Sequence, residues 1–257
     1  MRLVAIAQRL IHKPAAMKIA ILSDIHALAG PYKSALSAAR AEGFDLLVIM
    51  GDLLTYGVQP EQTLDLTQDA IDRDGAKLLL GNHDAVYRDG PLRCAGYLAQ
   101  LPKWVRESFE WTRERAGSAP LWQSEAWLSE YSVKDLLLSH ANPFGEGNWT
   151  YLNGPEPFER ACRALATRGY SCGVFGHVHR FRRFVHDETG TTAVTIGSIG
   201  QPREPQGGSQ WAMVELTPHG VCIEQRRVTV DWREEAAAVM ASSLSEPTKQ
   251  RIVGYFI

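Results

Sequence analysis

The chain has 257 residues, of which 45% are hydrophobic and 22% charged, and its formal net charge at pH 7 is −2. This composition is ordinary for a soluble globular protein with a sizeable core, and the balanced charge argues against a surface that coats polyanions generally. No apolar stretch approaches the roughly 20 residues that span a bilayer, which excludes a membrane-spanning helix. The widely spaced cysteines form no CxxC pair, so we expect buried thiols in a reducing compartment rather than disulfides or a thiolate zinc site; they are Cys94, Cys162, Cys172 and Cys222.

Residues 1–16 contain a short apolar stretch that is broken by Gln8 and Arg9. This break argues against a signal peptide. We expect these residues to form an extension ahead of a domain that begins at Met17, and we expect a cytoplasmic protein.

Three continuous apolar runs in the first half predict strands that are covered on both faces: residues 18–24, 44–52 and 76–82. The segments between them, residues 31–43 and 60–75, begin at proline and end at glycine, which is typical of helices. Strand–helix–strand units of this length are right-handed and predict a largely parallel sheet.

The pattern then changes to helices that carry several tryptophans. Residues 92–117 and 120–131 both read as helices, so we predict a helical insertion at about 88–130. Such an insertion would serve as a lid, as a dimer contact or simply as a packed layer. The chain continues with a predicted strand at 135–140, a helix at 155–168 and a strand at 171–177.

The last part of the chain is richer in strands. Two hairpins are predicted, with turns at 188–190 and 218–220, and the tail from Trp232 reads as an alanine-rich helix. We therefore predict an α/β protein in which two sheets pack together with helices outside. One domain would cover 17–230, and a C-terminal helix and tail would cover 231–257.

Polar side chains follow the apolar runs at the predicted strand ends. The carboxyl ends of parallel strands meet in one crevice, so we expect these groups to converge. Two pairs are spaced two residues apart, and in an extended segment both side chains of such a pair point the same way. The groups are Asp24, His26, Asp52, Asn82, His83, Asp84, His140, His177 and His179.

Carboxylates, an amide and imidazoles without a thiolate form a donor set that suits manganese, iron, zinc, cobalt or nickel. Two such ions about 3.5–4 Å apart can clamp a phosphoryl group and lower the pKa of a bound water to about 7. Two aspartates and a hydroxide leave the site net positive, which would attract an anion. We expect one ion on Asp24, His26 and His179, a second on Asn82, His140 and His177, and Asp52 between them.

His83 is not needed as a ligand and would protonate a leaving oxygen or stabilise negative charge on the phosphoryl group, while Asp84 would orient it through a hydrogen bond. Each short motif alone is as typical of a polar turn as of a metal site; the indication comes from all of them in order, each at the end of an apolar run. The remaining histidines, His12, His186 and His219, read as structural or solvated.

These residues resemble the pattern of the calcineurin-like metallophosphoesterase superfamily, which is D-x-H, G-D, G-N-H-[DE], H and G-H-x-H. The match spans residues 24 to 179. The resemblance implies a four-layer α/β/β/α sandwich of two mixed sheets with a centre of two divalent or trivalent transition-metal ions. It places the family's ligand roles on the seven positions already assigned and the catalytic imidazole on His83.

Departures from the pattern narrow the branch of the superfamily. Protein Ser/Thr phosphatases and bis-nucleoside tetraphosphatases carry an arginine shortly after G-D, and this chain has none in "GDLLTYGVQP". The Ser/Thr phosphatases also have an acidic G-N-H-E where this chain has "GNHD". The segments "SHANP" and "TIGSIGQPR" resemble the small prokaryotic phosphodiesterase-type branch. That branch often has glycine and asparagine after D-x-H, whereas this chain has "ALAG", so its substrate loop differs.

Three further segments bear on the substrate. The loop "GSIGQPR" would turn backbone N–H groups toward the site and let Arg203 pair with phosphate, or it is a plain connection with a solvated arginine. Asn148, with Trp149 and Tyr151, would floor a base or ring, or these residues serve ordinary packing. The run "RFRRF" at 180–184 suits single-stranded nucleic acid in composition, but a strand with mixed faces explains it better.

The function that this sequence favours is a metal-dependent phosphodiesterase acting on a small or nucleotide-like substrate through a metal-bound hydroxide. The alternatives are a phosphomonoesterase or phosphoprotein phosphatase on the same centre, and a non-catalytic scaffold, which would be expected to have lost a ligand. The balanced charge argues against a nuclease and against stable nucleic-acid binding. No membrane partner is expected, and a homo-oligomer remains open.

Overall fold

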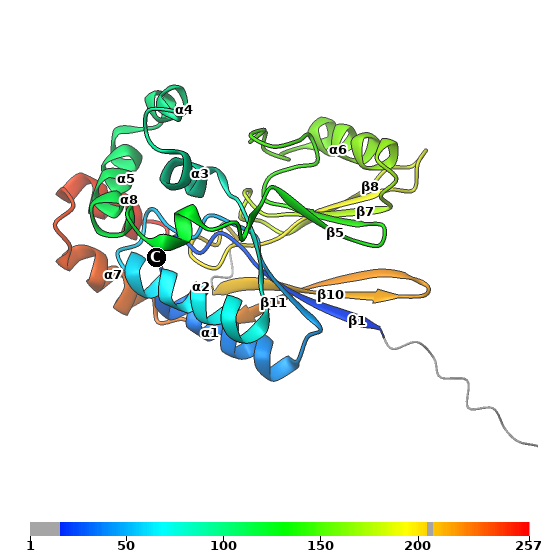
Figure 1. The fold of residues 1–257 in the computed structure, drawn as a ribbon, viewed down its shortest axis with the longest axis horizontal. Coiled ribbons are helices and arrows are strands. Elements are labelled where there is room, and N and C mark those ends of the chain that lie inside the picture. The colour runs from blue at the N-terminus through cyan, green and yellow to red at the C-terminus, as the bar shows by residue number, and fades with distance from the viewer. Residues whose placement is uncertain (1–15, 205–207, 257) are drawn as a thin grey trace, which may run out of the picture.

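The computed structural model describes residues 16–204 and 208–256, so residues 1–15 of the predicted extension lie outside the described residues. The protein contains two packed sheets with helices on their outer faces (Figure 1). The first sheet has the order β11-β10-β1-β2-β3-β4, and the second has the order β5-β6-β7-β9-β8. The predicted α/β/β/α sandwich of two mixed sheets is confirmed.

The first sheet is parallel over its middle strands, as the strand–helix–strand pattern predicts. β1 (Met17–Leu22), β2 (Leu46–Ile49), β3 (Lys77–Leu79) and β4 (Trp127–Leu128) run parallel, and β10 (Ser209–Thr217) and β11 (Gly220–Val228) add an antiparallel hairpin. In the second sheet β6 (Leu136–Ser139), β7 (Cys172–Phe175) and β9 (Thr192–Thr195) are parallel, and the edges β5 (Glu130–Val133) and β8 (Arg182–Val185) are antiparallel.

Alternate residues of β1 enter two different cores, which is why its apolar run is continuous. Ile19 and Ile21 pack between the two sheets against Leu136, Val174 and other residues of the second sheet. Ala20 and Leu22 face the other side, where α1 (Ala29–Glu42) and α2 (Pro60–Asp74) cover the sheet. A strand with both faces buried needs apolar residues at every position.

The outer face of the second sheet is covered by α6 (Pro155–Thr167), whose Phe158, Cys162 and Leu165 pack on Leu137 and Phe175. The remaining helices gather at one end of the sandwich (Figure 1). They are α3 (Asn82–Asp89), α4 (Ala95–Gln100), α5 (Lys103–Ala116), α7 (Trp232–Ala241) and α8 (Glu246–Val253). Helix α8 packs against α5, and α7 packs against α8. None of the described helices is long and apolar enough to cross a membrane.

The prediction of one helix over 120–131 is wrong. Pro120–Gln123 forms only a short 3-10 turn, after which β4 and β5 follow as edge strands of the two sheets. The indoles of Trp122 and Trp127 donate hydrogen bonds to the carbonyls of Ala116 and Leu121. Each of these bonds reaches six residues back along the chain, which is not a helical spacing. A short apolar run alone does not distinguish strand from helix.

Smaller corrections concern the element ends and the cysteines. The predicted strand at 76–82 ends at Leu79, because α3 begins at Asn82. Two helices rather than one follow Trp232, since Pro247 begins a new helix. Cys162 and Cys172 are buried as expected, but Cys222 on β11 is exposed. Both predicted hairpins are confirmed as β8–β9 and β10–β11.

Candidate metal centre

All the predicted donor side chains converge at one end of the two sheets. They lie in the turns that follow β1, β2, β6 and β7 and at the first residue of α3, and each is at most 4% exposed. The structure therefore brings together Asp24, His26, Asp52, Asn82, His140, His177 and His179.

The backbone at these positions is left-handed, which the sequence did not indicate. Asp24, His26, Asp52, His177 and His179 have φ angles of 56°, 55°, 53°, 64° and 59°. We expected extended D-x-H and H-x-H segments, and that part of the argument is wrong. Positive φ in residues other than glycine costs about 1–3 kcal/mol and persists where the surroundings enforce it, typically at functional sites.

Two glycines allow the strand ends to approach each other closely. A Cβ atom on Gly81 would lie 2.2 Å from Oδ1 of Asp52, and one on Gly176 would lie 2.2 Å from Oγ of Ser23. Real Cβ atoms do not approach other atoms so closely, so these positions accept only glycine while the donors keep their places. This explains physically why glycine precedes the polar residues at both tips.

The first donor group joins the end of β1 to the end of β7. Nε2 of His179 lies 3.1 Å from Oδ1 of Asp24 and 3.2 Å from Nε2 of His26. The second group joins β2 to β6 and β7 through Asp52, His140 and His177. Within each group of three residues one donor atom per residue lies within 4.8 Å of the others.

Asp52 lies between the two groups. Its Oδ2 is 3.4 Å from Nε2 of His140 and 4.0 Å from Nε2 of His26, which belong to different groups. Oδ1 of Asn82 completes the second group, at 3.1 Å from Nε2 of His140. This is the arrangement that a bridging carboxylate between two ions requires.

Backbone carbonyls hold one nitrogen of each histidine in the two groups. Nδ1 of His140 contacts the carbonyl of Met50 at 2.7 Å, and Nδ1 of His179 contacts that of Gln201 at 3.0 Å. In the same way His26 contacts Leu54 through Nδ1, and His177 contacts Trp149 through Nε2. A ring that donates one N–H to a carbonyl presents a lone pair on its other nitrogen, which is the orientation of a metal ligand.

The donor set fits cations better than it fits protons. With Nδ1 of both rings donating to carbonyls, Nε2 of His26 and Nε2 of His179 present two lone pairs to each other at 3.2 Å. Although burial alone would raise the pKa of Asp52, the nearby His140 holds it well below its ordinary value. Buried anions and facing lone pairs of this kind are neutralised when metal ions lie between them.

His83 differs from the ligand histidines in its surroundings. Its ring stacks on Phe109 at a centroid distance of 4.9 Å, and its Nε2 lies 3.3 Å from the hydroxyl of Tyr56. Its buried Nδ1 has no hydrogen-bond partner among the described residues. Burial lowers the pKa of His83 to about 4 despite the attraction of Asp52, so the imidazole is neutral near pH 7 and can donate its N–H.

Asp84 does not orient His83, contrary to the prediction. Its carboxylate instead accepts hydrogen bonds from the backbone N–H groups of Asp52, Leu53 and Gly81, at 2.6, 2.9 and 3.0 Å. The residue therefore joins the end of β2 to the start of α3. The sequence showed that a polar group was needed there, but not that its partners were backbone amides.

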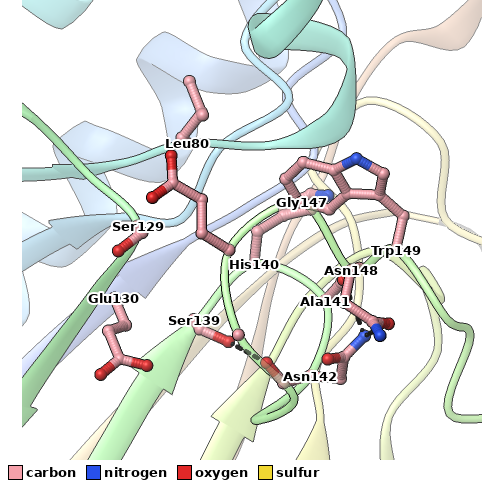
Figure 2. Close-up of a pocket in the computed structure, with 12 residues that line it drawn as sticks. Leu80, Ser129, Glu130, Ser139, His140, Ala141, Asn142, Gly147, Asn148 and Trp149 are labelled. Carbon is pink, nitrogen blue, oxygen red and sulfur yellow. Dashed lines mark hydrogen bonds between the residues drawn. The ribbon is translucent and has the colours of Figure 1, made fainter.

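The two predicted substrate residues have different surroundings. Asn148 lies in the recess beside His140 shown in Figure 2, where its Oδ1 accepts from Nδ2 of Asn142 at 3.2 Å and from the N–H of Thr150 at 3.0 Å. These two hydrogen bonds stabilise the loop, so the side-chain oxygen of Asn148 is already engaged within the protein. The N–H of Arg203 donates to the carbonyl of His179, and its guanidinium has no partner among the described residues.

The glycine/serine loop before Arg203 uses its backbone amides to hold the segment that carries Asp24, so these amides do not face the site. The N–H groups of Ile199 and Gly200 donate to the carbonyls of Ser23 and Asp24, at 3.0 and 2.9 Å. Oγ of Ser198 donates to the carbonyl of Asp24 as well, at 2.8 Å. The plain structural interpretation of this loop is therefore correct for its backbone.

Sequence reasoning missed two tyrosines at the centre. The hydroxyl of Tyr56 contacts His83, and the hydroxyl of Tyr97 accepts a 2.7 Å hydrogen bond from Nδ2 of Asn82. A third, Tyr151, stacks on His177 at a centroid distance of 4.0 Å and is 45% exposed. Tyr151 is among the residues that the sequence indicated, together with Asn148 and Trp149. Nothing in the local sequence indicated a functional role for Tyr56 or Tyr97.

Comparison with known proteins places this fold and site in a family. The calcineurin-like phosphoesterase superfamily domain matches residues 17–218, so the chain belongs to this superfamily of metallophosphoesterases. A curated relative is the uncharacterized protein MJ0912 of Methanocaldococcus jannaschii, which is 23% identical over 91% of this chain and 96% of its own.

Two solved structures share the whole fold. The metallophosphoesterase from Sphaerobacter thermophilus aligns with a TM-score of 0.71 at 21% identity and covers 93% of this chain and 99% of its own. The hypothetical protein PH1004 from Pyrococcus horikoshii aligns with a TM-score of 0.76 at 15% identity and covers 92% and 97%. At these identities the similarity concerns the fold.

Proposed function

We propose that this protein is a cytoplasmic phosphodiesterase of the small prokaryotic type that uses two metal ions to hydrolyse a small or nucleotide-like phosphodiester. The observation that carries the proposal is the pair of donor groups that meet at Asp52, with His83 beside them. Transition-metal ions such as manganese, divalent or trivalent, would neutralise phosphate oxygens and activate water when bound there.

Different residues would bind the two ions and hydrogen-bond the phosphate. Asp24, His26 and His179 would hold one ion, and Asn82, His140 and His177 the other, with Asp52 between them. His83 lies 3.9 Å from the bridging oxygen of Asp52, so its N–H is positioned to hydrogen-bond a phosphate or leaving oxygen.

Arg203 and Tyr151 support a diester with an aromatic group. The guanidinium of Arg203 is free to pair with the single negative charge of a diester. Burial raises the pKa of Tyr151, and the charge of Arg203 opposes that rise. The half-exposed ring of Tyr151 offers a face on which a base or aryl group can stack.

Two other functions stay as alternatives. A phosphomonoesterase or phosphoprotein phosphatase would use the same centre. Its monoester substrate would carry more negative charge on the phosphate than a diester does. A non-catalytic scaffold is disfavoured, because all seven donor side chains and His83 are present and converge.

The test is hydrolysis of a generic aryl phosphodiester and of the matching monoester by metal-stripped protein that has been reconstituted with manganese. We expect metal-dependent turnover with the diester preferred. A preference for the monoester would replace the proposal with the phosphatase alternative. No turnover of either ester by protein with both ions bound would contradict this proposal and favour the scaffold.

A further inference from the structure

The helical insertion reaches the metal centre through one side chain. Tyr97 on α4 accepts a hydrogen bond from Nδ2 of Asn82 at 2.7 Å. The other end of the same amide, Oδ1, faces His140 at 3.1 Å. Tyr97 therefore contacts the NH₂ end of the Asn82 amide, while the oxygen end faces His140.

This contact holds the amide in place with its oxygen toward His140. An amide oxygen can bind a metal, whereas the NH₂ group has no lone pair available for one. Asn82 is 4% exposed, so water cannot easily replace a missing partner of its NH₂ group. Tyr97 accepts from Nδ2 in this orientation. A 180° turn of the amide would make Tyr97 the donor and would point the NH₂ group, instead of the ligand oxygen, at the site.

The helix that carries Tyr97 has few other attachments. No residue of α4 is fully buried, and Tyr97 and Leu98 are only partly buried against the core that covers the first sheet. The partly buried hydrogen bond from Asn82 to Tyr97 is therefore the direct link between α4 and the donor groups. Any ion that fixes Asn82 would also favour the docked position of α4, because such couplings are reciprocal.

We propose that Tyr97 is a positioning residue for the ion of Asn82, His140 and His177, and that binding of this ion is linked to docking of α4. The inference rests on the two-metal centre of the proposed function, but not on the reaction or its substrate. It gives the helical insertion a role in metal binding, in place of a lid or a dimer contact.

The experiment titrates metal-stripped protein with manganese and follows binding by calorimetry. It compares the unchanged protein, Tyr97→Phe, and Tyr170→Phe as a matched loss of a phenol from a half-buried position after α6. Loss of an outer hydrogen-bond partner typically lowers metal affinity about 10–100-fold. We expect that loss in one of two binding events of Tyr97→Phe, and unchanged binding in Tyr170→Phe.

The outcomes separate this inference from the proposed function. If the unchanged protein binds fewer than two ions, the two-metal centre and this inference both fail. If it binds two and Tyr97→Phe binds both as tightly, only the inference is overturned. An equal weakening of both events would also overturn it, because Tyr97 contacts one donor group.

A second measurement needs no variant. Hydrogen exchange of the amides in residues 91–101 is compared with and without manganese in the unchanged protein. We expect slower exchange with the metal bound, by several-fold or more, because docking of α4 and binding are linked. Identical exchange in both states would contradict the linkage even if Tyr97→Phe failed to fold.

Discussion

At the scale of single residues, the histidines of the centre fall into two kinds. Those in the two donor groups each use one ring nitrogen on a backbone carbonyl, as His140 does on Met50. His83 has no such carbonyl partner; it packs on Phe109 and contacts the hydroxyl of Tyr56. A ring held by a carbonyl is oriented as a metal ligand would be, whereas Nδ1 of His83 has no partner among the described residues.

His83→Ala should remove catalysis without removing the metals. A positioned imidazole typically contributes about 10²–10⁴-fold in rate, so we expect kcat on an aryl phosphodiester to fall by that factor. His219→Ala, which changes a histidine in an exposed turn, serves as the control and should match the unchanged protein. Retained activity in His83→Ala at equal metal content would show that another group does this work.

Gly81→Ala should damage the centre although alanine is a small residue. Its Cβ would lie 2.4 Å from the backbone nitrogen of Asp52, so Asp52 and its carboxylate must move. Overpacking of this kind costs about 1–3 kcal/mol of stability, and we also expect loss of bound metal by elemental analysis. Gly96→Ala is the matched control, because nothing lies within 4 Å of its added methyl group. Full metal content in Gly81→Ala would contradict the assigned role of Asp52.

The convergence of the donor side chains could be predicted from sequence because each follows a recognisable apolar run within a few positions. The roles of Asp84 and Asn148 could not, since their partners are backbone groups that come together only in the folded loops. Tyr56 and Tyr97 were missed for a related reason. Tyr56 lies 27 residues before its partner His83, and Tyr97 lies 15 residues after its partner Asn82. A tyrosine in a loop or a helix does not by itself indicate a functional site.

At the scale of elements, α7 packs on the start of α1 through a buried carboxyl group. Glu235 is 6% exposed, and its Oε1 lies so close to Gly30 that a Cβ there would be 2.5 Å away. Burial, followed by repulsion from Glu234, raises the pKa of Glu235 from 4.5 to about 7. Among the residues that the structure describes, no hydrogen-bond donor contacts this carboxyl group.

Glu235 should make the protein less stable as the pH rises. Because its pKa is raised by folding, its favourable contribution is fully present below about 4.5 and is lost as the pH passes through about 7. We therefore expect the Tm to fall more between pH 5 and pH 8 in the unchanged protein than in Glu235→Gln. Glu159→Gln, at an exposed position on α6, should keep the original dependence. Equal pH dependence in all three proteins would contradict the assignment.

The elements that the sequence predicted well are those with continuous or long periodic patterns. The strands β1, β2, β3, β6 and β7 and the helices α1, α2 and α6 lie within a few residues of their predicted places. The prediction for the segment at 120–131 failed because its two short strands join the edges of the two sheets. Edge pairing depends on neighbours that the local sequence does not specify.

At the scale of the whole molecule, the packing of the two sheets brings together residues of one donor group that lie in different halves of the chain. Asp24 and His26 follow β1 in the first sheet, and His179 follows β7 in the second. The centre therefore forms only when the sandwich is complete, and bound ions would stabilise the folded chain by binding to no other state. The insertion and the C-terminal helices close the same end of the sandwich (Figure 1).

The most direct test of the two-metal centre is an anomalous-diffraction map of crystals of the manganese-reconstituted protein. The account predicts two peaks about 3.5–4 Å apart on either side of Oδ2 of Asp52. One would lie among Asp24, His26 and His179, and the other among Asn82, His140 and His177. A single peak, or peaks that Asp52 does not contact, would contradict the bridging carboxylate and with it the proposed chemistry.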